Sequence, residues 1–145
     1  MVETGHFASL WNNMAQKLGL KVELLKTDWR QGLDPNEIEK RLRLDADKKI
    51  KAVCIVHNET STGCTSDVKA VREILDNLNH DALLMVDSIS GLASMNYEHD
   101  EWGVDVTVSG SQKGLMLPPG LSFNAISDKA LRTSKTSGMR RSYWD

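Results

Sequence analysis

Several signals that would direct this chain of 145 residues to a membrane or an organelle are missing from its sequence. No apolar run approaches the roughly 20 residues that a membrane-spanning helix needs, and the N-terminus lacks the basic-then-apolar layout of a signal peptide. The C-terminus shows neither a lipidation box nor a peroxisomal tripeptide. The sequence therefore predicts a soluble, cytoplasmic protein with no membrane partner.

The chain also has little net charge and few cysteines. The 18 basic and 20 acidic residues give a net charge of -2, and no basic stripe is present that would gather the phosphates of a nucleic acid. The two cysteines, Cys54 and Cys64, have neither the density of a disulfide framework nor the spacing of metal ligands. We expect a reducing compartment, no nucleic-acid partner and no metal.

The length and the apolar content set the size of the core. A chain with 40% hydrophobic residues and this length can bury one compact core. It is short for an enzyme that must enclose both a cofactor and a substrate. One domain is expected.

The spacing of the apolar residues alternates between helical and extended patterns along the chain. Helical spacing or a capping residue predicts helices at residues 7–18, from Asp34, from 65–67 to 78, and from Ser127. Alternation predicts a short strand at residues 21–25, and further strands are predicted at residues 50–56, 82–86, 104–108 and 121–126. Strands that alternate with helices at these lengths predict an α/β fold with a mostly parallel sheet and right-handed crossovers.

Three polar segments follow the predicted strands, at residues 57–63, 87–91 and 109–114. In open α/β sheets, ligands bind at the carboxyl ends of the strands, where loops and helix N-termini converge. These three segments are therefore the candidate site.

Asp87 ends the apolar run at 83–86. An acidic residue in this position also holds magnesium in P-loop NTPases, but that interpretation needs a Gly-x-x-x-x-Gly-Lys-Ser/Thr loop, and the sequence has none. Asp87 then remains either a ligand-binding or catalytic group, or a structural turn former.

Lys113 follows a predicted buried strand and lies among small residues that leave room for a ligand. A solvated surface lysine is the alternative. Pyridoxal phosphate chemistry needs a lysine amine for a Schiff base and an acidic partner that keeps the pyridine nitrogen protonated. Asp87 and Lys113 form one such pair, from neighbouring strand ends.

Four motifs, in this order, resemble the class V aminotransferases of pyridoxal phosphate fold type I, particularly the serine–glyoxylate and alanine–glyoxylate aminotransferases. They are Gly5-His6-Phe7, the segment His57-Asn58-Glu59-Thr60-Ser61-Thr62-Gly63, Val86-Asp87-Ser88, and Ser109-Gly110-Ser111-Gln112-Lys113-Gly114 with Pro118-Pro119-Gly120 after it. The resemblance spans essentially the whole chain. It implies a three-layer αβα fold with a mostly parallel sheet, part of the large domain of such an enzyme.

The resemblance implies two catalytic residues. Lys113 is expected to form the Schiff base with pyridoxal 5′-phosphate, and Asp87 to pair with the pyridinium nitrogen.

The resemblance also implies four further cofactor contacts. Phe7 and Ile89 are expected to sandwich the cofactor ring, the Thr60 hydroxyl to lie near its phenolic oxygen, and Gln112 to contact its phosphate. From the pattern alone, Phe7 has an alternative role as a core residue at a helix start. Thr60 likewise has an alternative role as a turn former before Gly63.

For the complete enzyme, the resemblance implies transfer of an amino group from serine, or alanine, to glyoxylate, in a homodimer with its sites at the subunit interface. Family members are more than twice as long, so residues 1–145 are expected to form a cofactor-binding large domain truncated at both ends, without the small C-terminal domain. Two other interpretations stay open: a non-catalytic fragment of such an enzyme, and a related lyase or desulfurase.

Overall fold

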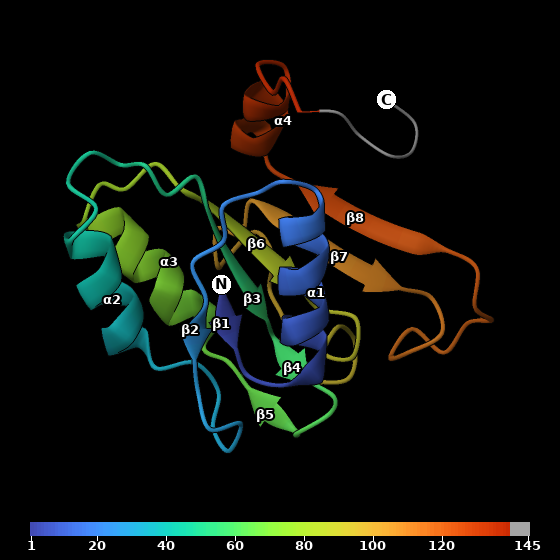
Figure 1. The fold of residues 1–145 in the computed structure, drawn as a ribbon. Helices are drawn as coiled ribbons and strands as arrows, with labels where there is room; N and C mark the ends of the chain where they lie inside the picture. The colour runs from blue at the N-terminus through green and yellow to red at the C-terminus, as the bar shows by residue number, and fades with distance from the viewer. Residues whose placement is uncertain (140–145) are drawn as a thin grey trace.

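The computed structural model describes residues 1–139, which form an α/β fold (Figure 1). The helices are α1 (His6–Lys17), α2 (Pro35–Arg43), α3 (Val68–Asn77) and α4 (Asp128–Ser134). The strands are β1 (Val2–Glu3), β2 (Leu25–Lys26), β3 (Ala52–Val56), β4 (Asn58–Glu59), β5 (Cys64–Thr65), β6 (Leu83–Asp87), β7 (Val106–Gly110) and β8 (Ser122–Ile126). No helix within this described range is long and apolar enough to cross a bilayer.

The central sheet has the strand order β3-β6-β7-β8. Strands β3, β6 and β7 are parallel, and β8 returns antiparallel to β7, which confirms the mostly parallel sheet. Asp87 at the end of β6 lies opposite Val56 of β3 on one side and Val108 of β7 on the other. The loops that leave β3, β6 and β7 therefore start at the same edge of the sheet.

Side-chain caps start three of the helices. Asp34, Asp67 and Ser127 each accept a hydrogen bond from a backbone N–H in the first turn of the helix that follows. A short polar residue in this position satisfies an N–H group that has no partner within the helix. The predicted helix starts at these three residues are confirmed.

The hydrophobic core lies between the sheet and the pair α2–α3. In Figure 1, α1 and the α2–α3 pair lie on opposite sides of β3. The core side chains are apolar and at most 6% exposed, and from α2, α3, β3 and β6 they are Ile38, Leu42, Val53, Ile55, Val68, Val71, Leu75, Leu84 and Val86.

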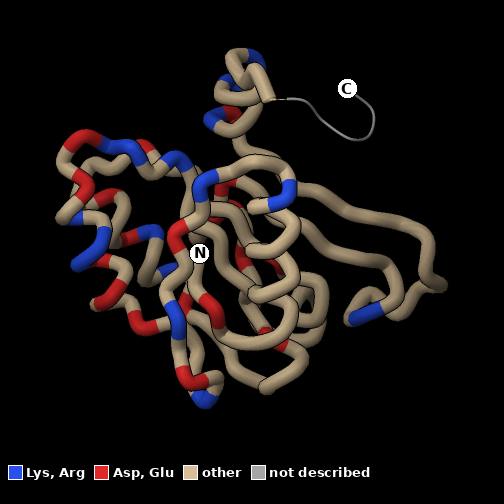
Figure 2. Tube along the Cα trace, in the orientation of Figure 1, with Lys and Arg blue, Asp and Glu red and all other residues tan. Residues whose placement is uncertain are grey.

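Helix α1 is confirmed, but it directs its large apolar side chains outward. Its buried positions hold Ala8, Asn12 and Ala15. Its exposed apolar side chains are Phe7, Leu10 and Met14, and Leu18, directly after the helix, is exposed as well. Every residue of β8 is exposed as well. Figure 2 shows that charged residues gather along α2 and α3, whereas α1 and β8 carry few, so two nearly uncharged surfaces face outward.

Two predictions for the N-terminal half of the chain, a strand and a loop, are wrong in part. Of the expected strand at 21–25 only Leu25 is a strand residue, because β2 is Leu25–Lys26 and its partner β1 offers only two residues for pairing. The expected loop at 57–63 contains strand β4, which forms a small antiparallel hairpin with β5.

The expected strand at 104–108 begins two residues later, at Val106. The cause lies in Asp105, whose side-chain Oδ2 accepts the hydrogen bond of the Leu84 N–H at 2.9 Å. The Asp105 N–H still donates to the Leu84 carbonyl at 2.9 Å, but the Leu84 N–H donates to a side chain and not to the β7 backbone, so the regular ladder with β6 begins at Val106. The strand then extends to Gly110, so Ser109 and Gly110 belong to it.

We predict that Leu75→Ala, in the core, lowers the free energy of unfolding by about 2–5 kcal/mol, because it leaves a cavity beside α2. Leu44→Ala, in which the removed side chain is 73% exposed, is the matched control and should change it by less than about 0.5 kcal/mol. Urea unfolding of the two variants measures the difference. Equal losses would contradict the position of the core.

Candidate functional site

The loops after β6 and β7 touch at the carboxyl edge of the sheet. A Cβ atom added at Gly114 would lie 2.2 Å from the carbonyl oxygen of Leu92 and 2.6 Å from Oγ of Ser94. Only a residue without a side chain allows this approach. The segment that carries Lys113 therefore rests directly on the segment that follows Asp87.

Asp87 is half-buried, and only one of its carboxylate oxygens has a protein partner. Oδ1 accepts a hydrogen bond from the Ile89 N–H at 2.9 Å, and within residues 1–139 the carboxylate makes no other hydrogen bond or ion pair. Burial raises the pKa of Asp87; the Ile89 N–H opposes this shift, and the Glu59 carboxylate adds to it. Asp87 thus forms the turn that the sequence allowed, and its second oxygen has no partner among residues 1–139.

Lys113 is exposed, and its amine makes no hydrogen bond or ion pair with any described residue. The loop that carries it is fixed at its base by Ser111, which is fully buried. Ser111 Oγ donates to the carbonyl of Pro118 at 2.7 Å and accepts from the Leu121 N–H at 3.3 Å. A lysine amine at the end of an anchored loop can reach a ligand at the sheet edge.

The other predicted contacts lie on segments around the same edge. Phe7, in the first turn of α1, is 43% exposed, so it is not the core residue that the pattern allowed. Thr60 lies exposed in the turn between β4 and β5, and its hydroxyl has no hydrogen-bond partner among residues 1–139. Ile89 is half-buried two residues after Asp87, and Gln112 is exposed beside Lys113.

Glu59 joins α1 to the β4–β5 hairpin, and sequence analysis gave it no role. It is fully buried, and its carboxylate accepts hydrogen bonds from the N–H groups of Phe7 at 3.2 Å and Ala8 at 3.1 Å. A signal was present: Gly5 precedes α1 without a side chain to cap it, and the first turn has no acidic residue. A helix start of this kind needs a partner from elsewhere.

A second link joins the loops after β3 and β6. Asn58 Nδ2 donates to Ser90 Oγ at 2.9 Å, and Ser90 Oγ donates to the Asn58 carbonyl at 2.8 Å. The His57 N–H donates to the Asp87 carbonyl at 2.9 Å. The Asp87 turn is therefore held on both sides, by the loop after β3 and by the loop after β7.

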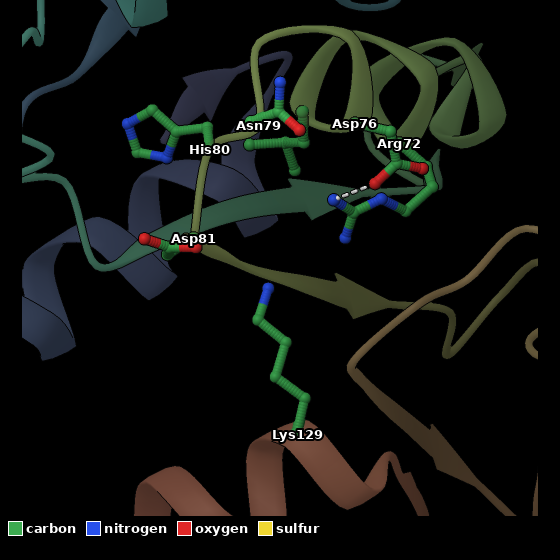
Figure 3. A pocket seen from close by; sticks show the side chains of 7 residues that line it. Arg72, Asp76, Asn79, His80, Asp81 and Lys129 are labelled. Atoms are coloured by element: carbon green, nitrogen blue, oxygen red, sulfur yellow. Dashed lines mark ion pairs between the residues drawn. The ribbon is translucent and has the colours of Figure 1, made fainter.

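A cavity of about 380 Å³ lies at the opposite edge of the sheet, before β6 (Figure 3). Its cations are already matched by carboxylates: Arg72 pairs with Asp76 at 2.7 Å, and both Arg72 and Lys129 lie within 3.7 Å of Asp105. This network fastens α3 and α4 to the sheet. It contains none of the predicted site residues.

The carboxyl edge thus combines the Lys113 amine and the second Asp87 oxygen, neither of which has a partner among residues 1–139, with the exposed aromatic ring of Phe7. An amine in this setting can attack a carbonyl carbon, and a carboxylate can hold a protonated ring nitrogen. The exposed face of an aromatic side chain suits a flat ligand. These side chains fit a planar aromatic aldehyde with a basic ring nitrogen.

Comparison with known proteins gives a consistent result. The aminotransferase class-V family profile matches residues 1–141. A serine–glyoxylate aminotransferase from Methylorubrum extorquens is 49% identical over 131 residues, which cover 90% of this chain and 33% of that protein. An L-aspartate–glyoxylate aminotransferase from Paracoccus denitrificans is 44% identical over 141 residues, which cover 97% of this chain and 36% of that protein.

A solved structure agrees with the fold. The alanine–glyoxylate aminotransferase from Nostoc sp. superposes with a TM-score of 0.88 at 28% identity, over 99% of this chain and 37% of that one. The chain therefore spans about a third of the length of the relatives it matches.

We predict that Gly114→Ala lowers the free energy of unfolding by about 1–3 kcal/mol, because its methyl group would collide with the Leu92 carbonyl. Gly138→Ala is the matched control, since a Cβ at that position meets nothing within 4 Å. Chemical denaturation measures both variants. A Gly114→Ala variant as stable as the control would rule out the close contact between the two loops.

We also predict that Asp87→Asn raises the melting temperature of the ligand-free chain at pH 7. The folded pKa of Asp87 lies above its ordinary value of 3.8, so its contribution to stability is present below that value and is lost as the pH rises through the folded pKa. The amide removes this loss and keeps an acceptor for the Ile89 N–H. Calorimetry at pH 7 and pH 4 should show the larger gain at pH 7; an equal or larger gain at pH 4 would contradict the burial of this charge.

Proposed function

The chain belongs to the class-V aminotransferases, and on that basis we propose that it forms the cofactor-binding part of an enzyme that transfers the amino group of serine, or alanine, to glyoxylate. The observation that carries the proposal is the pair Asp87 and Lys113. Their loops are in direct contact, and neither the Lys113 amine nor the second Asp87 oxygen has a partner among the described residues.

The family and the fold imply pyridoxal 5′-phosphate as the cofactor. When bound, this group supplies an electron sink that weakens the Cα–H bond of an amino acid. In our proposal Lys113 provides the amine that holds the cofactor and then moves the α-proton. Asp87 keeps the ring nitrogen protonated, because an ionised carboxylate favours the nearby positive charge.

Four side chains would bind the cofactor without taking part in proton transfer. Phe7 and Ile89 would cover the two faces of the ring, where flat and apolar side chains exclude water. The Thr60 hydroxyl would donate to the phenolic oxygen, and the Gln112 amide to a phosphate oxygen.

The two relatives named above share glyoxylate as the acceptor and differ in the amino donor. We propose glyoxylate as the acceptor, with serine as the first donor to test. Serine would give hydroxypyruvate and glycine, and alanine would give pyruvate and glycine. The alternative of a desulfurase finds no support in Cys64, which is buried with its sulfur 3.6 Å from the Trp29 carbonyl oxygen.

We propose that the chain acts as part of the large domain of a homodimeric enzyme. The outward apolar side chains of α1 and the exposed strand β8 support this, because large exposed apolar surfaces usually lie at interfaces. A second candidate function is a fragment that binds the cofactor without turnover.

We predict that pyridoxal 5′-phosphate forms an adduct on Lys113 that borohydride reduction makes permanent. Lys113→Arg should abolish the adduct, because the guanidinium does not form it. Lys69→Arg, an exposed lysine of α3, is the matched control and should leave the adduct intact. Peptide mass spectrometry locates the modification. An adduct that survives Lys113→Arg would refute the assignment of Lys113.

Turnover separates the two candidate functions. The chain with its adduct is mixed with serine and glyoxylate, and hydroxypyruvate is followed. Product formation supports the aminotransferase, and an intact adduct without product supports the non-catalytic fragment.

A further inference from the structure

Helix α1 has no cap from its own sequence, although it carries the proposed ring-stacking residue Phe7. Gly5 occupies the capping position without a side chain, and the first turn contains no acidic residue. The first N–H groups of any helix have no partner within it. The start of α1 would fray unless another segment accepted these hydrogen bonds.

The β4–β5 hairpin supplies those acceptors. Glu59 Oε1 accepts from the Phe7 N–H at 3.2 Å, and Oε2 accepts from the Ala8 N–H at 3.1 Å. The His6 N–H donates to Ser61 Oγ at 2.9 Å, and that hydroxyl donates to Glu59 Oε1 at 2.7 Å. Three consecutive N–H groups of α1 are thereby satisfied by one buried carboxylate and one hydroxyl.

Gly5 allows the hairpin to press against the helix start. A Cβ atom at this position would lie 2.5 Å from Glu59 Cγ and 2.6 Å from Ser61 Oγ. A capping side chain at position 5 and the Glu59 side chain therefore exclude each other in the native chain. In this chain the capping position holds Gly5, and the carboxylate of Glu59 caps the helix in its place.

Glu59 is itself rigidly held. Its carbonyl oxygen accepts hydrogen bonds from the N–H groups of Gly63 at 2.7 Å and Thr62 at 3.1 Å, which close the turn that contains Thr60. The side chain is fully buried, and its negative charge faces the positive end of the α1 dipole. One residue thus fixes both the helix that carries Phe7 and the turn that carries Thr60.

We infer that Glu59 is a positioning residue of the cofactor site, which holds the Phe7 ring and the Thr60 hydroxyl in a fixed relation to each other. This inference rests on the proposed function, because it assigns a purpose to the placement of Phe7. Glu59 has no contact with the reacting atoms in this account and acts through the start of α1.

The test is Glu59→Gln, a substitution of nearly the same size and shape. The amide keeps one acceptor, but its NH2 group faces a helix N–H instead of accepting from it. We expect amide hydrogen exchange at Phe7 and Ala8 to become at least about tenfold faster, and the Kd for pyridoxal 5′-phosphate to rise by at least about tenfold. Both are measured well below the melting temperature. Glu37→Gln, in the first turn of α2, is the matched control and should change neither.

A coupled substitution distinguishes positioning from general stabilisation. Phe7→Ala should weaken cofactor binding strongly in the wild-type chain and much less in the Glu59→Gln chain, because the ring is then already misplaced. If the two substitutions raise the Kd independently, so that the fold-changes of the single variants multiply in the double variant, the inference is overturned. An unchanged Kd in Glu59→Gln would also overturn it.

A rescue covers the possibility that the substitution disturbs folding. A Cβ at position 5 would meet the side chains of both Glu59 and Ser61, so Glu59→Ala together with Ser61→Ala makes room there, and Gly5→Ser in that double-variant background should cap α1 from its own chain. We expect slower exchange at Phe7 and Ala8, and a tighter Kd, than in the Glu59→Ala/Ser61→Ala chain alone. Slower exchange without a tighter Kd would show that the cap does not serve the cofactor.

Failure of the proposed function and failure of the inference about Glu59 give different experimental results. A wild-type chain that forms no adduct with pyridoxal 5′-phosphate would refute that function, and the inferred purpose of Glu59 with it. The exchange measurement needs no cofactor, so faster exchange in Glu59→Gln would still establish Glu59 as the cap of α1.

Discussion

The parallel pairing of β6 with β3 and β7 is the constraint on which the candidate site depends. The register places Asp87 opposite Val56 and Val108, so three loops leave the sheet at one edge. Parallel strands need long crossovers, and here α3 supplies the connection between β3 and β6. The buried face of α3 forms much of the core. The stability of this edge of the sheet therefore depends on the packing of α3 against the sheet.

Direct contacts hold the segments around this edge of the sheet together. Gly114 lets the Lys113 loop rest on the segment after Asp87, and Glu59 fastens the start of α1 to the β4–β5 hairpin. The buried carboxylate is stable there because it accepts several hydrogen bonds and lies at the positive end of a helix. Asp87 differs, because burial raises its pKa and one of its oxygens has no partner in the part of the chain that the structure describes. A carboxylate whose charge is costly to bury is suited to a cationic ligand.

Local chemistry made part of this structure predictable. Asp34 and Ser127 marked helix starts because a capping side chain acts within one turn, and apolar runs located the central strands. Strand β2 was misplaced because its length depends on the two residues of β1, which no local pattern reveals. The site motifs predicted roles for Asp87 and Lys113, but the role of Glu59 depends on a contact across 52 residues with Phe7. The outward direction of the α1 apolar side chains was equally hidden, because periodicity does not say which surface faces the sheet.

The central claim is that one planar cofactor is bound between the loops of Asp87 and Lys113. A crystal structure of the chain after borohydride reduction with pyridoxal 5′-phosphate tests it most directly. The account predicts the ring attached to Lys113, its nitrogen about 3 Å from the free oxygen of Asp87, and the Phe7 ring stacked on one face. A cofactor bound at another lysine, or a ring nitrogen directed away from Asp87, would contradict the account.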